Sequence, residues 1–334
     1  MRLIALEEHY AVESLMKRIP ADVVIKRGFP DPAKPSMRPE IEANLIEMGE
    51  RRLGYMNDSG ISMQVLSSSG PGSELLTAAE SVSWARETND FLADHIAKTP
   101  DRFAGFAHLP LADPEKAADE LDRCVNKLGF RGMMVNGTID DVFLDDPRFE
   151  PVLERCEALG VPLYVHPGIP PASIRETYYS NLQGPMPFIL SRAGYGWHAE
   201  VAVHILRLCL SGALDKHPKL QVVVGHQGEG LPAMMTRFDE QMTSLTPKFL
   251  QRTVTQMMHD QLHITTAGFY SVPAFNMLLQ VFGIDKLMFS VDYPYSRNDW
   301  AREFFDKIDL SPADREKFAH GNAERLLNIK PAAD

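Results

Sequence analysis

The chain has 334 residues, of which 44% are hydrophobic and 24% charged, a composition typical of globular proteins with one or two domains. Its 34 basic and 45 acidic residues give a formal charge of −11, which argues against nucleic acid or an anionic membrane as the main partner. No stretch approaches the roughly 20 apolar residues of a membrane span, and no signal-peptide pattern precedes the first expected strand. The cysteines, Cys124, Cys156 and Cys209, lie far apart, which favours buried free thiols and a cytoplasmic location.

The first expected strand, residues 3–9, ends in three groups that can carry charge: Glu7, Glu8 and His9. Because successive side chains of a strand point to opposite faces, Glu7 and His9 share one side and Glu8 points to the other. A carboxylate next to an imidazole forms half of a metal site, although the triplet alone would also fit a charged surface. The other half of such a site has to come from later strands.

A Pro-rich segment between residues 30 and 39 follows this strand. Loops of that length inside a compact domain are usually functional, so we expect it to lie over the first strand end as a lid or substrate loop. A helix is then expected over residues 39–57, where Asp58-Ser59-Gly60 stops it.

From residue 61 onward, short apolar strands alternate with helical segments. The expected strands cover residues 61–66, 103–107, 132–135, 162–165, 220–224, 262–266 and 287–291. Asp113 as N-cap and Pro114 at the first helical position mark one helix start, and a second long irregular segment spans residues 169–194. Eight strand–helix units predict a parallel (β/α)₈ barrel, formed by residues 1–334 as a single domain, rather than an open sheet.

Polar side chains stand directly after several of these strands. The active site of such a barrel lies at the C-terminal ends of its strands. The residues at those ends are Glu7, His9, His166, His226 and Asp292. This mixture of carboxylates and imidazoles suits a divalent ion such as Zn²⁺ or Mn²⁺, so we predict a metal centre at the barrel rim.

Two further histidines are interpreted differently. His108 ends the third expected strand, and we expect it to be structural. His198 lies at a helix start, beside Trp197 and two residues before Glu200, and is a secondary candidate for the site.

Four stretches of the sequence carry a family resemblance. They are Leu6-Glu7-Glu8-His9, Val165-His166-Pro167-Gly168, Gly225-His226-Gln227-Gly228-Glu229 and Val291-Asp292-Tyr293-Pro294. Together they resemble the amidohydrolase-2 branch of the amidohydrolase superfamily. Within it, Glu-x-His on the first strand is similar to the metal-dependent, non-oxidative decarboxylases of hydroxybenzoic acids, including those of γ-resorcylate, 2,3-dihydroxybenzoate, salicylate and 5-carboxyvanillate. The resemblance runs nearly end to end.

The resemblance implies roles for the residues at the strand ends. One divalent metal ion, Mn²⁺ or Zn²⁺, would be held by Glu7, His9, His166 and Asp292. His226 would lie beside the metal, with Glu229 orienting its ring. Asp292 would protonate the ring carbon that carries the carboxylate of an ortho-hydroxybenzoic acid before CO₂ is lost, after receiving a proton from the substrate hydroxyl or a bound water.

The resemblance also implies a small aromatic acid as substrate and a homodimer or homotetramer as assembly. Arg237 matches a substrate-contacting arginine of the family, and Tyr295 matches an aromatic residue that packs against the substrate ring. Phe188 and Trp197 are further candidates for an aromatic-lined pocket. A metal-dependent hydrolase of a lactone or amide, or a hydratase, is the alternative; Glu7, where hydrolases more often carry histidine, favours decarboxylation.

Overall fold

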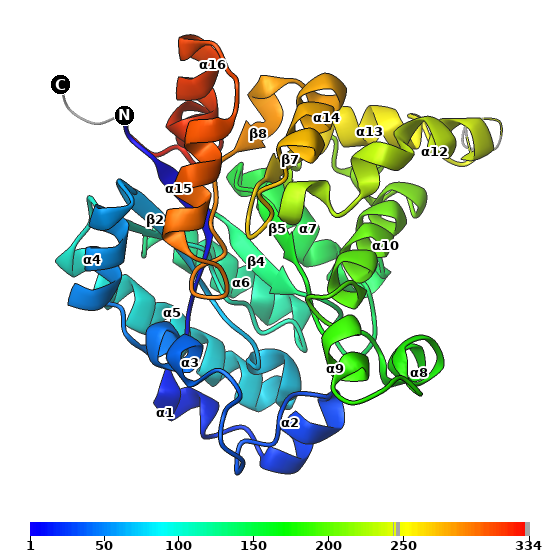
Figure 1. Ribbon diagram of the computed structural model, residues 1–334. Helices are drawn as coiled ribbons and strands as arrows, with labels where there is room; N and C mark the ends of the chain where they lie inside the picture. Colours follow the sequence, from blue (N-terminus) through cyan, green and yellow to red (C-terminus); the bar gives the residue numbers. More distant parts are fainter. Residues whose placement is uncertain (243, 245–247, 331–334) are drawn as a thin grey trace.

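Eight parallel strands with helices around them form the body of the protein (Figure 1). The computed structural model describes residues 1–242, 244 and 248–330. The strands are β1 (Ile4–Tyr10), β2 (Met63–Ser68), β3 (Phe103–Gly105), β4 (Met133–Asn136), β5 (Leu163–His166), β6 (Val222–Val224), β7 (Leu262–Thr265) and β8 (Leu287–Met288). All eight occur where the sequence predicts a strand.

The strands follow one another in sequence order, as expected for a (β/α)₈ barrel. Backbone pairing is continuous from β1 to β3 and again from β4 to β8. Single bridges connect the two sheets at Ala107 and Met133, and at Glu8 and Tyr293. The barrel architecture is therefore confirmed, although its two seams are joined by single bridges rather than by continuous ladders.

The helices surround the strands, and several begin at conventional signals. They are α1 (Glu13–Met16), α2 (Ala21–Arg27), α3 (Pro39–Ile46), α4 (Glu50–Asp58), α5 (Ala78–Lys98), α6 (Pro114–Asn126), α7 (Glu150–Leu159), α8 (Ala172–Ile174), α9 (Met186–Leu190), α10 (Gly196–Leu210), α11 (Ala213–Lys216), α12 (Met235–Met242), α13 (Val254–Gln261), α14 (Val272–Phe282), α15 (Asn298–Lys307), α16 (Pro312–Glu316) and α17 (Asn322–Leu327). Asp113 caps α6 as predicted, its side chain accepting a hydrogen bond from the amide of Lys116. Among the described residues, no helix is long and apolar enough to cross a bilayer.

One expectation for the N-terminal third was wrong. The helix expected over residues 39–57 is two helices, because Glu47 turns its side chain to the amides of Gly49 (2.7 Å) and Arg52 (3.0 Å) and so caps a new start. A further helix, α2, precedes the Pro-rich segment, at residues for which the sequence analysis made no prediction. Pro20 lies just outside that helix, where the missing amide hydrogen costs nothing.

The barrel interior is filled by apolar side chains from the strands. Ile4 and Leu6 of β1 belong to this interior cluster, and α17 packs against it. The pairing of β1 with β2 shifts register between Ala5 and Glu8. Such a shift lets consecutive residues face the same side, so that Leu6 fills the interior while Glu7 also turns inward at the rim.

The connection from β5 to α10 extends from the barrel as short helical pieces; we call residues 167–195 the β5–α10 segment. It contains α8, the π-helical turn η3 (Arg175–Tyr179) and α9, which lie together with α2 at one edge of the molecule (Figure 1). Arg192 donates a hydrogen bond to the carbonyl of Gly28, at the end of α2. The guanidinium of Arg175 occupies the space that a Cβ at Gly28 would need. The segment is thus held to α2 by side-chain contacts.

Candidate metal centre

Four of the predicted residues converge at the C-terminal rim of the barrel. Glu7 and His9 come from β1, His166 ends β5 and Asp292 follows β8. Each contributes a ligand atom, and these atoms all lie within 4.8 Å of one another. His9 Nε2 is 3.3 Å from Asp292 Oδ1, and His166 Nε2 is 3.3 Å from Glu7 Oε1. Four side chains from three strand ends therefore surround one point.

The unpartnered atoms of this cluster fit a cation. Glu7 Oε1, His9 Nε2 and Asp292 Oδ1 are buried and have no hydrogen-bond partner among the described residues. Buried polar atoms are rarely left in that state unless an ion, water or ligand satisfies them. Two carboxylates and two imidazoles are ligands for a divalent ion of borderline or hard character. The donor set therefore matches the predicted metal.

Close packing shifts the proton affinities of these groups in opposite directions. Burial raises the pKa of Glu7 to about 7, an effect that Asp292 strengthens and His226 and His9 oppose. Burial alone would also raise the pKa of Asp292, but the neighbouring imidazoles of His226 and His9 outweigh burial and lower that pKa to about 2. Burial and the neighbouring His9 hold the pKa of His166 well below its ordinary value, so its imidazole is neutral and able to bind a metal.

Hydroxyl groups behind the cluster orient its members. Ser67 on β2 lies 3.1 Å from His9 Nδ1, which leaves Nε2 to face the cluster. Tyr164 donates to Glu7 Oε2, and its hydroxyl lies 2.7 Å from Thr265 Oγ1. The sequence analysis missed Tyr164, although it precedes His166 by two residues and so shares its face of β5.

Glu8 points away from the cluster, as the alternation of β1 predicts, but into the protein and not to solvent. Its carboxyl group accepts hydrogen bonds from the amides of Val291 (2.9 Å) and Tyr293 (3.3 Å) and from Gln64 Nε2 (3.1 Å). The buried Arg52 donates to the carbonyl of His9 in the same region. Glu8 thus fixes the strand end that carries the two ligands.

His226 lies next to the cluster on the loop after β6. Its Nε2 is 3.5 Å from Glu7 Oε1 and 3.8 Å from Asp292 Oδ2. On the other side of the ring, Nδ1 is 2.7 Å from Glu229 Oε1, the contact that the family resemblance implied. Burial alone would lower the pKa of His226, but the charges of Glu229 and Glu7 raise it well above its ordinary value. A Cβ at Gly225 would clash with Glu7 Oε2, so glycine is needed directly before this histidine.

The secondary candidate His198 extends this arrangement. Its Nδ1 lies 2.5 Å from Glu229 Oε2, so that one carboxylate contacts two imidazoles. His108, expected to be structural, accepts a hydrogen bond at Nε2 from the amide of Ser73 (3.2 Å).

The candidate substrate-binding residues differ in how close they lie to the cluster. Tyr295 lies at the site: its ring centroid is 5.5 Å from that of His9, and its hydroxyl is 2.5 Å from Ser69 Oγ. Phe188 on α9 packs under the guanidinium of Arg192, and Trp197 begins α10 with its indole nitrogen buried and unpartnered among the described residues. Arg237 is not brought to the cluster in this chain, because its exposed guanidinium pairs with Glu240 one turn further along α12.

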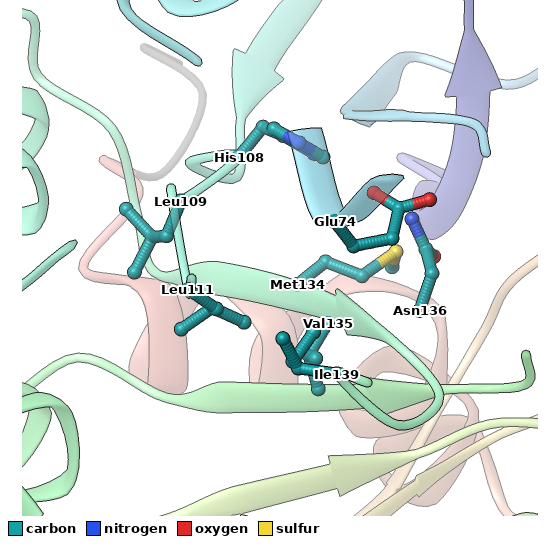
Figure 2. Close-up of a pocket in the computed structure, with 8 residues that line it drawn as sticks. All are labelled: Glu74, His108, Leu109, Leu111, Met134, Val135, Asn136 and Ile139. Carbon is teal, nitrogen blue, oxygen red and sulfur yellow. The ribbon is translucent and has the colours of Figure 1, made fainter. Parts of the chain in front are cut away.

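A small cavity beside β4 supplies further polar groups near His166. Figure 2 shows the Glu74 carboxyl group next to the side chain of Asn136, with His108 and Met134 also lining the space. Asn136 pairs with His166 in the β4–β5 register. Burial raises the pKa of Glu74. Neither Glu74 nor Asn136 was a sequence candidate, because single polar residues in a loop and at a strand end carry no spacing signal.

Fold and site together define a parallel barrel with a carboxylate–imidazole cluster, a candidate metal centre, at its rim. The amidohydrolase family model (Amidohydro_2) matches residues 37–329, and the chain belongs to this family. The matched range begins after β1.

Curated relatives and solved structures are similar over nearly the whole chain. A γ-resorcylate decarboxylase from Polaromonas sp. (strain JS666) is 36% identical over 340 residues, covering 98% of both chains. A crystal structure of the dihydroxybenzoic acid decarboxylase from Polaromonas sp. JS666, with bound manganese and the inhibitor 2-nitroresorcinol, has a TM-score of 0.87 at 35% identity and covers 99% of this chain and 98% of that one. The 5-carboxyvanillate decarboxylase from Sphingomonas paucimobilis has a TM-score of 0.90 at 29% identity, with coverage of 98% and 99%.

Proposed function

We propose that this protein is a metal-dependent decarboxylase of an ortho-hydroxybenzoic acid, and that the metal is manganese. The observation that carries the proposal is the convergence of Glu7, His9, His166 and Asp292, with unpartnered buried atoms facing one another. Relatives that share the fold end to end are hydroxybenzoate decarboxylases, and one of them holds manganese together with a resorcinol inhibitor. The family match over residues 37–329 supports a single barrel domain.

Decarboxylation of an aromatic acid requires a proton at the ring carbon that carries the carboxylate. Protonation there interrupts the aromatic system; the C–C bond then breaks, its electron pair restores the aromatic ring, and CO₂ leaves. A divalent ion at this site would supply Lewis-acid stabilisation of the negative charge that develops on the substrate. The four residues named above would hold that ion.

Asp292 is the proposed acid. With a pKa near 2, Asp292 does not keep its own proton at neutral pH, so a proton has to reach it during turnover. The substrate hydroxyl is one source. His226 is the other, because its raised pKa keeps it protonated and its Nε2 lies 3.8 Å from Asp292 Oδ2. Glu229 holds the His226 ring in that direction through Nδ1.

Aromatic side chains near the cluster would bind the substrate ring. Tyr295 is the best placed, because its ring packs beside His9. We propose Trp197 and Phe188 as more distant walls of the same pocket. The proposed role of Arg237 is supported by the family resemblance alone.

Assembly and location complete the proposal. Large apolar side chains of the β5–α10 segment, such as Tyr178 and Tyr195, are 68% and 58% exposed and support a homodimer or homotetramer. Cys124, Cys156 and Cys209 are free and buried, which supports a cytoplasmic location.

The test is a screen of manganese-loaded protein against ortho-hydroxybenzoates, with CO₂ release and the phenolic product measured together. Decarboxylation of at least one hydroxybenzoate is the expected result, and para-hydroxybenzoate, which lacks the ortho oxygen, serves as the control. Ring opening of a lactone, hydrolysis of an amide or hydration of an unsaturated acid, with no CO₂ from any hydroxybenzoate, would instead establish the hydrolase or hydratase alternative.

A further inference from the structure

His198 lies between two hydrogen-bond acceptors. Its Nδ1 is 2.5 Å from Glu229 Oε2, and its Nε2 is 3.1 Å from the backbone carbonyl of Ala193. A carbonyl oxygen can only accept, so Nε2 carries a hydrogen. A hydrogen is also needed between Nδ1 and the carboxyl group of Glu229. It belongs either to the imidazole, which is then a cation, or to Glu229.

The surroundings of Glu229 assign this proton to the histidine. Burial alone would raise the pKa of Glu229, but the charge of His226 and the hydrogen bonds from His198 and His226 outweigh burial and lower it. Glu229 is therefore a carboxylate whose two oxygens each accept from one imidazole. The titratable groups in contact with His198 are Glu229 and His226, both on the loop after β6; its remaining ring neighbour is Phe269.

Other histidines in the described chain show how directly partners determine protonation. His204, on the same helix, accepts a hydrogen bond at Nε2 from the amide of Leu144 (3.1 Å) and is therefore neutral. His217, outside the site, faces carboxylates at both nitrogens: Glu150 at 2.8 Å and Glu157 at 3.2 Å. His198 has the surroundings of His217, not those of His204.

The loop that carries Glu229 needs support from outside. His226, Gln227 and Glu229 have φ values of 48°, 54° and 55°, a left-handed conformation that is unfavourable for residues with a side chain. His198 reaches this loop from α10, and Phe269 packs against the rings of both His198 (4.8 Å between centroids) and His226 (5.4 Å). These contacts hold the strained backbone in the conformation that directs His226 at the cluster.

We infer that His198 is a positioning residue, whose imidazolium neutralises Glu229 and holds it against His226 so that Nε2 of His226 stays directed at Glu7 and Asp292. This inference rests on the proposed function only where turnover is measured. Through Nε2, His198 also fastens the end of the β5–α10 segment, at Ala193, to the same ion pair.

The protonation state is tested by neutron diffraction on crystals of the deuterated, manganese-loaded protein near neutral pH. We expect deuterium on both ring nitrogens of His198 and none on Glu229. His204, which accepts a hydrogen bond from the amide of Leu144, is the internal reference for a singly protonated ring. A single deuteron on His198, or a deuteron on Glu229, would overturn the inference. So would a second metal ion among His198, His226 and Glu229, whose ligand atoms also lie within 4.8 Å of one another. This readout does not depend on which reaction the enzyme catalyses.

The positioning role is tested by comparing His198→Gln with His198→Lys on the substrate found in the screen. Gln keeps a hydrogen-bond donor without the charge, whereas Lys keeps the charge. Mutation of a residue that supports a metal site typically lowers activity by about 10–100-fold. We therefore expect kcat of H198Q to decrease by that factor, while KM and the manganese content stay unchanged. H198K should recover part of the loss.

His204→Gln is the matched control on α10, because a Gln oxygen can still accept from Leu144, and its kcat should stay near that of the parent enzyme. Unchanged kcat in H198Q, or a change confined to KM, would contradict the positioning role. If no substrate is decarboxylated, the proposed function fails while the neutron result still decides the charge of His198.

Discussion

The metal cluster and the β5–α10 segment are held in place by different kinds of interaction. The cluster residues follow strands whose backbones are paired, and Glu7 and His9 are fully buried. The segment is made of short helical pieces fastened to α2 by Arg175 and Arg192, and it exposes several large apolar side chains. If the proposed function holds, we expect the strand ends to determine the reaction and the β5–α10 segment to determine which aromatic acid binds. Variants in the two regions should therefore affect different kinetic constants.

The largest effect should come from removing the metal that the cluster is proposed to hold. Exhaustive chelation should abolish turnover, and Mn²⁺ should restore it. Binding to the folded state alone also stabilises a protein by about 2.7 kcal/mol when the free metal is 100 times Kd, so the melting temperature should fall on chelation. A chelated preparation, verified by elemental analysis, that kept its activity would disprove the metal centre.

Replacement of the proposed acid should be nearly as damaging. Asp292→Asn removes the group that delivers the proton, a contribution typically worth about 10²–10⁴-fold in kcat. Circular dichroism should show an intact fold. Asp299→Asn is the control, because Asp299 is exposed and pairs only locally with Arg297. Turnover of D292N within tenfold of the parent would rule out the assignment.

A third effect concerns the pH dependence of metal binding. In the metal-free protein the pKa of Glu7 is raised to about 7, so below that pH the carboxyl group carries a proton that the metal must displace. Manganese affinity should fall by about tenfold per pH unit below 7 from this group alone and change less above 8. Calorimetric titrations in two buffers of different ionisation enthalpy would count the released protons. An affinity that is flat between pH 6 and 8 would contradict this.

The smallest effect is expected in the β5–α10 segment. Arg192→Ala removes a guanidinium that lies 3.7 Å from the Phe188 ring and bonds to Gly28, contacts worth about 1 kcal/mol each. KM should rise several-fold while kcat and manganese affinity stay unchanged. Arg207→Ala, which removes a similar guanidinium from the ring of Phe143 on the outer side of α10, is the control. A loss of metal binding in R192A would show that the two regions are not independent.

The contrast between the cluster and the β5–α10 segment also explains which features could be predicted from the sequence. The strand ends were predictable because a short apolar run followed by a polar group is a local signal, and Glu7, His9, His166 and Asp292 each carry it. Tyr164 could also have been predicted, because it precedes His166 by two residues and therefore lies on the same face of β5. The hydrogen bond between His198 and Glu229 joins residues 31 positions apart on different elements, so no spacing rule could have found it. The course of residues 167–195 depends on contacts with Gly28, which are more distant still in sequence.

The carboxyl group of Glu8 has a consequence for biosynthesis. It bonds the first strand to the backbone amides of residues 291 and 293, at the seam where the beginning and the end of the barrel meet. Two proposed ligands, Glu7 and His9, precede the strands that complete the barrel, whereas Asp292 follows the last of them. A growing polypeptide therefore cannot assemble the proposed centre until residue 292 has left the ribosome, so the four side chains come together late in synthesis or after it.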